Sequence, residues 1–347
     1  MKAWTDKCAY LSPKGREWLE SMSPSEVKRI LVIRQCAFGD YMATRPFLVE
    51  LRKLFPKAHI TLATVSAYRY AVPEDLIDEV FVQKTEGSLA EQWRALCDVS
   101  SFDMLFDLAD TARSRLLTFR TTASIKLGFP YRPLFNHLLY DVGLRRTNYH
   151  YEAEVLLDFL KVMGHKPTYP LDFAMPWHLG SEAERVIAYF PFASTPDKSL
   201  PLDSWRQLIE EAARTFSDYR HILLEGNKAE ESGDFIAEVM AGSRNVSVQP
   251  CMELDDLAKW MAHVSILVCG DTGVRNLALA THTPTLGIFF KTLPYRYWPR
   301  YEDFHEAVFR RDGSMPSRVD ILPSLKALLL RQYPDRNQSC QTVEGSV

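Results

Sequence analysis

Short runs of apolar residues alternate with longer amphipathic segments through most of the chain. The run Ile30–Ile33 is typical of a strand buried on both faces, and the segment Tyr41–Leu54 that follows has helical spacing. The same reading predicts further strands at Ile60–Val65, Asp78–Gln83 and Met104–Leu108, and helices at Ala90–Asp98 and Tyr151–Met163. Strands that alternate with helices indicate βαβ units and a parallel sheet.

A similar pattern begins again after residues 165–180, which hold three prolines and little periodicity. Strands are predicted at 184–192, 221–226, 245–250, 265–271 and, as the last strand, 284–290. Helices are predicted at 203–216, 230–242, 254–263, 273–282 and 323–333. The fold class is therefore α/β, with two doubly wound, Rossmann-like parallel sheets whose ligands bind outside the carboxyl ends of the strands.

These patterns predict a domain at 29–165, a linker at 166–180 and a second domain at 181–333. Residues 1–28 are predicted to be a helical extension that docks on the body or lies against a membrane. Docking is favoured because the extension has little net basic charge. Residues 125–146 are interpreted as irregular and basic, and the polar tail 334–347 is predicted to be disordered.

The composition of the 347 residues narrows the function classes. The net charge of −3 gives no global positive field for nucleic acid, and the six cysteines form no metal-binding or disulfide pattern. There is no hydrophobic signal core and no apolar run of about 18 residues. A cytoplasmic protein, at most peripheral at the inner membrane, is expected.

Two turns after predicted strands carry candidate chemistry. Asp40 follows Gly39 at the end of the first strand, where a carboxylate serves as a helix N-cap or as a catalytic base. Both roles stay open, and Arg45 in the helix is a candidate for neutralising an acidic acceptor. The turn Gly270–Gly273 opens a helix, whose free N–H groups suit a phosphate. Thr272 and Gly273 are expected to face a diphosphate, and Asp271 to accept hydrogen bonds from sugar hydroxyls.

A third loop leaves the first strand of the second half. Ser194 and Thr195 offer hydroxyls and Lys198 offers a point charge for a diphosphate, although a solvated lysine is the commoner interpretation. Glu230 follows a later strand and is either a ribose ligand or a helix-start charge. In the first half, bases follow the strand at Met104–Leu108 and suit an anionic acceptor or are scattered surface charges: Arg113, Arg115, Lys126, Arg132, Arg145 and Arg146.

Four segments in order resemble glycosyltransferase family 9, the ADP-heptose:lipopolysaccharide heptosyltransferases. They are RILVIRQCAFGDYMATRPFLVELRKLFPKAHITL, FASTPDKSLPLDSWRQLI, LLEGNKAEE and LDDLAKWMAHVSILVCGDTGVRNLALATHTPTLGIFF. The resemblance covers roughly residues 29–325. It implies a GT-B fold, with two Rossmann-like domains facing a cleft, and an inverting transfer that needs no metal or other cofactor.

The resemblance also implies roles. Asp40 is similar to the general base, Lys198 to the diphosphate contact, Glu230 to the ribose contact, and Asp271, Thr272 and Gly273 to contacts of the donor sugar and phosphate. The implied partners are a nucleotide-sugar, ADP-heptose above all, and a glycan acceptor such as the anionic, lipid-linked lipopolysaccharide core.

This sequence departs from the family pattern at one position of that turn. Asn276 stands where the family has histidine, so it can hydrogen-bond but not titrate. The alternative function is a GT-B protein that binds a nucleotide-sugar or a partner without transfer. A nicotinamide enzyme is disfavoured, since neither half has G-x-G-x-x-G after its first strand.

Overall fold

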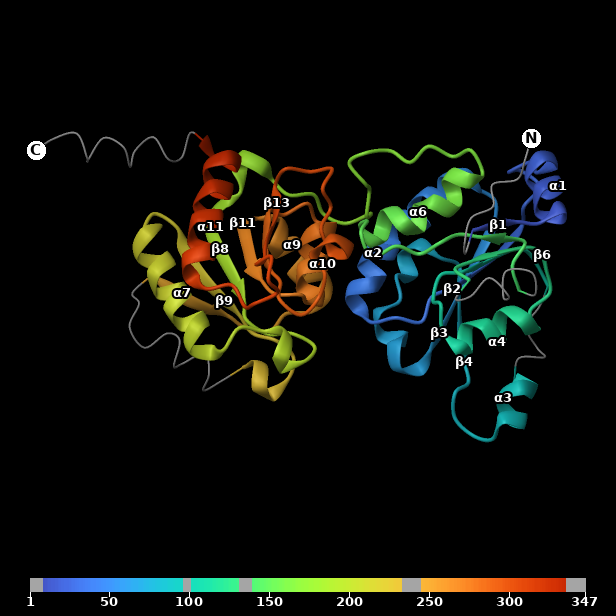
Figure 1. The fold of residues 1–347 in the computed structure, drawn as a ribbon, viewed down its shortest axis with the longest axis horizontal. Coiled ribbons are helices and arrows are strands. Elements are labelled where there is room, and N and C mark those ends of the chain that lie inside the picture. The colour runs from blue at the N-terminus through green and yellow to red at the C-terminus, as the bar shows by residue number, and fades with distance from the viewer. Residues whose placement is uncertain (1–8, 96–100, 131–138, 233–244, 335–347) are drawn as a thin grey trace, which may run out of the picture. The chain divides into compact units, whose positions relative to one another are not determined.

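The computed structural model describes residues 9–95, 101–130, 139–232 and 245–334. The chain divides into two compact units, Met1–Ala174 and Met175–Val347. Each unit is a parallel sheet covered by helices on both faces (Figure 1). The predicted α/β class with two doubly wound sheets is confirmed. The predicted helix at 230–242 and the tail after Pro334 lie largely outside the described residues.

The sheet of unit 1 has the order β1-β7-β6-β5-β2-β3-β4. All neighbouring strands are parallel except β1, which pairs antiparallel with β7. The strands are β1 (Tyr10–Leu11), β2 (Arg29–Ile33), β3 (His59–Val65), β4 (Glu79–Gln83), β5 (Phe102–Asp107), β6 (Ala123–Gly128) and β7 (Val142–Gly143). The helices are α1 (Pro13–Ser21), α2 (Phe38–Leu54), α3 (Leu89–Ala95), α4 (Ala112–Arg120) and α6 (Glu152–Val162), with 3₁₀ turns at Ser66–Ala71 and Glu74–Leu76.

Successive side chains of β5 point to opposite faces of this sheet and pack into two separate cores. The Phe106 ring packs edge-on against Phe47 of α2, at 5.2 Å, and against Phe159 of α6, at 6.2 Å. Its neighbour Leu105 packs with Leu117 of α4 in the cluster on the opposite face. Because successive strand side chains point to opposite faces, the continuous apolar run fills both cores.

The structure corrects two predictions in this unit. The segment 125–146, interpreted as irregular, contains part of β6 and all of β7. Strand β7 has only two residues, and Lys126 interrupts the apolar pattern of β6. The N-terminal extension is not only helical, because β1 adds a strand to the sheet edge before α1 begins. Helix α4 was also missed, since its polar composition hides the few residues that it buries.

The sheet of unit 2 has the order β10-β9-β8-β11-β12-β13 and is parallel throughout. Its strands are β8 (Glu184–Phe190), β9 (Arg220–Leu224), β10 (Val246–Gln249), β11 (Val264–Cys269), β12 (Thr285–Ile288) and β13 (His305–Val308). Its helices are α7 (Leu202–Thr215), α9 (Leu254–Ala262), α10 (Gly273–Ala280) and α11 (Arg318–Gln332), with 3₁₀ turns at Gly180–Glu182, Pro196–Lys198, Ala229–Glu231 and Pro294–Tyr297. Strand β13 was not predicted, so the expectation that 284–290 is the last strand is wrong.

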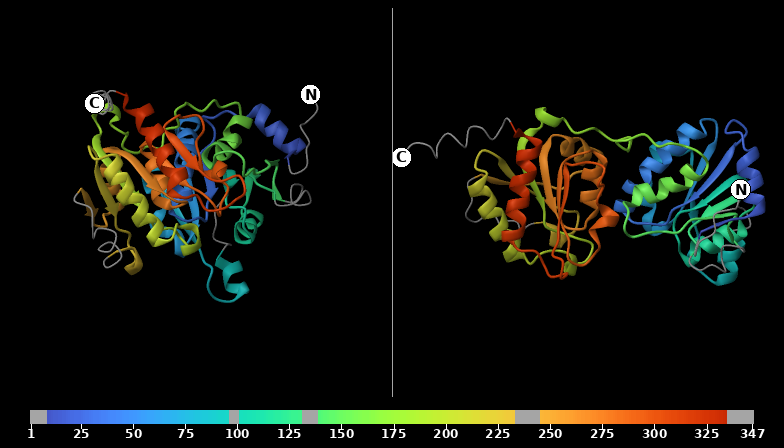
Figure 2. Two further views of the ribbon diagram at one scale, coloured as in Figure 1. Left: turned by 60° about the vertical axis from the view of Figure 1, so that its left-hand side comes forward. Right: turned by 45° about the horizontal axis from the view of Figure 1, so that its top comes forward.

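Helices α7 and α11 cover one face of this sheet, and α9 and α10 cover the other (Figures 1 and 2). Ile187 and Tyr189 of β8 point to the first face, while Val186 and Ala188 point to the second. The chain runs from β8 to β9 and β10 on one side, then returns to β11 on the other side of β8. That reversal makes a topological switch point between β8 and β11, where ligands of such sheets bind.

Candidate active site

The loops that follow β8 and β11 meet at the switch point of unit 2. The Nζ of Lys198, after β8, lies 3.1 Å from Oδ2 of Asp271, after β11. Thr292, which follows β12, donates a hydrogen bond of 3.0 Å to the same Asp271 oxygen. Adjacent parallel strands bring their carboxyl ends to one edge, so residues 73 positions apart in the sequence become neighbours.

The GDTG turn leads directly into α10, the helix that begins at Gly273. Thr272 is the N-cap residue, but its side chain makes no capping hydrogen bond. At Gly270 an added Cβ would lie 3.3 Å from the carbonyl oxygen of Lys198, so the glycine lets the two loops approach closely. The turn therefore presents the positive end of a helix beside an ammonium group, which favours an anionic ligand.

Asn276 lies in the first turn of α10 and is 6% exposed. Its Oδ1 is buried and has no hydrogen-bond partner within the part of the chain that the structure describes. The neighbouring Arg275 packs inward, with its guanidinium 5.2 Å from the Phe289 ring centre. Arg275 therefore belongs to the packing of the unit, whereas Asn276 offers an acceptor atom to a ligand.

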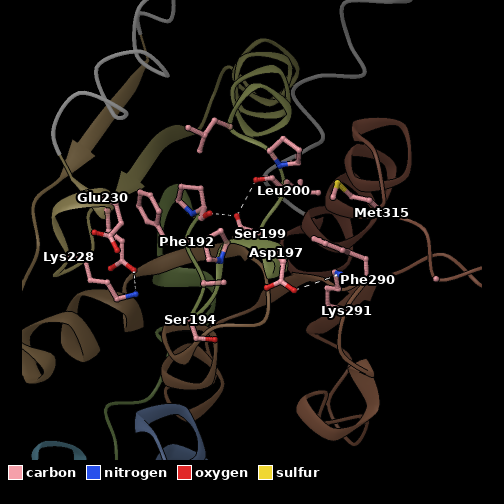
Figure 3. Close-up of a pocket in the computed structure, with 17 residues that line it drawn as sticks. Phe192, Ser194, Asp197, Ser199, Leu200, Lys228, Glu230, Phe290, Lys291 and Met315 are labelled. Atoms are coloured by element: carbon pink, nitrogen blue, oxygen red, sulfur yellow. Dashed lines mark hydrogen bonds and ion pairs between the residues drawn. The ribbon is translucent and has the colours of Figure 1, made fainter. Parts of the chain in front are cut away.

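A cavity of about 860 Å³ adjoins the β8 loop (Figure 3). Its wall is mostly apolar, with Phe192, Leu200 and Phe290 among the lining side chains, and Ser194 and Glu230 add polar groups. Glu230 is exposed, while the next residue, Glu231, is buried and pairs with Lys228 at 2.9 Å. Apolar walls with a few polar groups are typical of small-molecule sites.

The loop beside this cavity is held in place by Ser199 and Trp205. The Trp205 indole Nε1 donates to Ser199 Oγ at 3.1 Å, and Ser199 Oγ in turn donates to the Pro191 carbonyl. Trp205 is 1% exposed and anchors α7 in the core.

Of the predicted donor residues, Lys198, Asp271, Thr272 and Gly273 meet at the switch point. Ser194 and Glu230 line the cavity, and Thr195 is exposed in the same loop.

Asp40 lies in the first turn of α2 in unit 1, after β2. The helix begins at Phe38 with Ala37 as its N-cap, so the interpretation of Asp40 as the N-cap is wrong. One carboxylate oxygen of Asp40 is buried. A carboxylate in the first turn is stabilised by the unpaired N–H groups of the helix start.

Arg34 is a buried cation beneath Asp40, and the sequence reading did not single it out. Its guanidinium donates to Thr44 Oγ1 at 3.0 Å, to the Leu108 carbonyl at 2.7 Å and to Glu152 at 3.1 Å. Thr44 Oγ1 donates to the Asp40 carbonyl at 2.7 Å. Burial lowers the pKa of Arg34, but Cys36, Glu152 and Asp40 outweigh that effect and raise it. The signal that could have identified Arg34 is its position, a charged residue directly after the apolar run of β2.

The three predicted acceptor arginines are not brought together. Arg45 is 4% exposed, and its guanidinium donates to the Phe173 carbonyl at 2.6 Å and to Asp75 at 2.9 Å. Those contacts make Arg45 a packing residue in this structure and weigh against acceptor binding. On α4, Arg113 is exposed and Arg115 pairs with Asp110 at 3.2 Å.

The family model described as glycosyltransferase family 9 (heptosyltransferase) matches residues 90–322. The chain belongs to this family. It is accordingly a glycosyltransferase, which decides against the interpretation as a nicotinamide enzyme. The lipopolysaccharide heptosyltransferase 1 of Salmonella typhimurium is 24% identical over 292 residues, covering 77% of this chain and 89% of that protein. The Escherichia coli K12 protein of the same name is 23% identical over 292 residues, which again cover 77% of this chain and 89% of that protein.

Solved structures of the family share the fold. A family 9 glycosyltransferase from Veillonella parvula superposes with a TM-score of 0.66 at 19% identity, covering 88% of this chain and 98% of that one. The E. coli heptosyltransferase WaaC with ADP-2-deoxy-2-fluoro heptose superposes with a TM-score of 0.66 at 18% identity. The match covers 86% of this chain and 99% of that one. The predicted GT-B fold is confirmed. Among the described helices, none is long and apolar enough to cross a membrane.

Proposed function

We propose that this glycosyltransferase moves a heptose from ADP-heptose to a sugar of the lipopolysaccharide inner core, with inversion at the anomeric carbon. The observation that carries the proposal is the meeting of Lys198 and Asp271 at the switch point, beside the start of α10 and the 860 Å³ cavity. The names of the relatives, which are lipopolysaccharide heptosyltransferases, support the choice of donor and acceptor.

Each donor group has a chemical counterpart in unit 2. The nucleoside occupies the cavity, where Glu230 and Ser194 accept from or donate to ribose hydroxyls, with Thr195 nearby in the same loop. The diphosphate lies against Lys198, Thr272 and Gly273, where the ammonium and the helix start balance the charge of the leaving nucleoside diphosphate without a metal or cofactor. Asp271 and Asn276 accept hydrogen bonds from hydroxyls of the donor sugar.

The acceptor hydroxyl is activated by Asp40. The carboxylate takes the proton as the acceptor oxygen attacks the anomeric carbon, and the bond to the diphosphate oxygen breaks. Arg113 and Arg115, which lie on the helix after β5, contact acidic groups of the acceptor. Because such an acceptor is lipid-linked, the enzyme works at the cytoplasmic face of the inner membrane without crossing it.

The test is Asp40→Asn, with Asp158→Asn as a control that makes the same charge change at a half-exposed position of α6. Asp40→Asn should lower kcat by roughly 10²–10⁴-fold, as expected for loss of a general base. The affinity for ADP-heptose, measured by calorimetry, should stay unchanged. Near-normal turnover in Asp40→Asn would contradict the role of the carboxylate. Donor binding without transfer by the unmodified enzyme would favour the alternative, a nucleotide-sugar binder.

A further inference from the structure

A second cavity, of about 370 Å³, lies in unit 1. It is formed by α1, by the end of α4 and the residues that lead into β6, and by the segment before β7. Thr121 and Thr122 precede the amino end of β6, whereas Asp40 follows the carboxyl end of β2. Because the strands are parallel, these residues lie toward opposite edges of one sheet. The cavity is thus separate from the proposed catalytic residue.

Three basic side chains and one acidic side chain line this cavity: Lys14, Arg120, Lys126 and Asp141. Three positive charges and one negative charge leave a net charge of +2. The Asp141 carboxylate already accepts from the Lys126 backbone N–H at 3.0 Å and from Lys14 Nζ at 3.4 Å. Asp141 therefore holds two chain segments together. The lining keeps a net positive charge, because three basic side chains face one carboxylate.

The basic residues have partial explanations within the fold. Lys126 Nζ donates to the Thr118 carbonyl at 2.7 Å, which satisfies one carbonyl in the last turn of α4. The Arg120 guanidinium lies 5.0 Å from the centre of the half-exposed Trp93 ring. Burial lowers the pKa of Lys126, and Asp141 opposes that shift. A helix C-terminus alone would explain one base there, but not three from three elements.

Thr121 supplies the independent observation. It is 2% exposed and lines the cavity, and its hydroxyl oxygen is buried with no hydrogen-bond partner among the residues that the structure describes. A buried hydroxyl without a partner costs free energy, so such a group is expected to serve a ligand. A hydroxyl beside three cations is a donor that suits an oxyanion.

The wall formed by α1 is fixed firmly. The Ser12 N–H donates to the Asp141 carbonyl at 2.9 Å, and Ser12 Oγ caps α1 by accepting from Gly15 N at 2.8 Å. A Cβ on Gly15 would lie 2.8 Å from the Asp141 carbonyl oxygen, so only glycine lets the helix approach this closely. Helix α1 lies outside the residues 90–322 that match the family model.

We propose that this cavity binds a phosphate group, with Thr121 donating to one oxygen and Lys14, Arg120 and Lys126 balancing the charge. Both a soluble phosphate and the headgroup of an anionic phospholipid carry that chemistry. Phe119 also lines the cavity and is 61% exposed, which places an apolar side chain beside the cationic groups. That combination suits a headgroup whose acyl chains are close.

The test compares Thr121→Val with Arg16→Gln, a loss of charge on α1 outside the cavity lining. All variants carry Lys198→Gln, which removes phosphate binding at the proposed donor site. Inorganic phosphate is titrated by calorimetry, and Thr121→Val should weaken its binding roughly 10-fold to 100-fold, as for loss of a hydrogen bond to a charged group. Arg16→Gln should bind as the Lys198→Gln parent does.

Folding is checked by thermal melting, where Thr121→Val should match its parent because the hydroxyl has no protein partner in the described structure. Lys126→Gln is the second variant if Thr121→Val fails to fold. In a parallel experiment, binding of each variant to vesicles is measured by sedimentation. The vesicles contain phosphatidylglycerol in phosphatidylcholine, or phosphatidylcholine alone.

Two results support the proposal and separate the sources. Loss of phosphatidylglycerol binding in Thr121→Val identifies a lipid headgroup, and weakened phosphate binding without a vesicle effect identifies a soluble phosphate. The proposal is overturned if the parent binds neither probe, or if Thr121→Val and Arg16→Gln behave alike in both arms.

Discussion

Replacing Asp271 by asparagine removes a negative charge from the loop where we propose that the donor diphosphate binds. In the structure the Asp271 carboxylate forms an ion pair with Lys198, with 3.1 Å between Nζ and Oδ2. An incoming diphosphate must draw Lys198 away from Asp271 and is also repelled by that carboxylate. We therefore expect Asp271→Asn to bind ADP more tightly than the unmodified enzyme.

The burial of the pair sets the size of the effect. The side chains are 29% exposed for Lys198 and 12% exposed for Asp271. Two unit charges about 4 Å apart attract by about 4 kcal/mol at an effective dielectric constant near 20, whereas exposed pairs contribute about 0–1 kcal/mol net. A partly buried pair lies between these limits, so we expect about 1–2 kcal/mol, or about 5-fold to 30-fold tighter ADP.

Calorimetric titration of ADP measures this change. Asp203→Asn is the matched control, because Asp203 lies in the same unit and its side chain is 80% exposed in a pair with Arg206. The control should bind ADP as the unmodified enzyme does. Turnover with ADP-heptose should nevertheless fall in Asp271→Asn, since the donor sugar loses a charged acceptor. If Asp271→Asn, correctly folded by circular dichroism, binds ADP no more tightly than Asp203→Asn, the competition for Lys198 is refuted.

Two further predictions concern the stability of unit 2. In Gly287→Ala the new Cβ would lie 2.5 Å from Arg275 Nε and 2.7 Å from the Phe289 ring, so the free energy of unfolding should fall by about 1–3 kcal/mol; an unchanged urea midpoint would contradict this. Burial lowers the pKa of His305 to about 4 despite the nearby Glu302, whereas an unfolded histidine titrates near 6.5. The unfolded chain therefore takes up the proton first, so stability present above about pH 6.5 is lost as the pH falls towards 4. His305→Asn should flatten the dependence of the melting temperature on pH over this window, and an unaltered slope would rule out His305 as its source.

The apolar runs determined the fold class before any tertiary information. Ile30–Ile33 read as a strand buried on both faces, and the run at 184–192 read as a strand; both are apolar because helices cover both sides of each sheet. The same pattern placed Asp40, Lys198 and Asp271 in turns after strands. Short or polar elements escaped it: β7 has two residues, and α4 buries only three of its nine.

Tertiary structure alone decided which of these residues meet. No local spacing relates Lys198 to Asp271, or Arg34 to Glu152, which lies 118 residues away. The order of strands in a parallel sheet sets such pairs, and that order depends on how whole strand–helix units pack. The same dependence made Arg45 a packing residue and left the Thr121 hydroxyl buried. The sequence by itself thus determined the types of chemical group and the turns that carry them. Sheet topology decided which groups share a site, because only the stacking of strands brings distant turns to one edge.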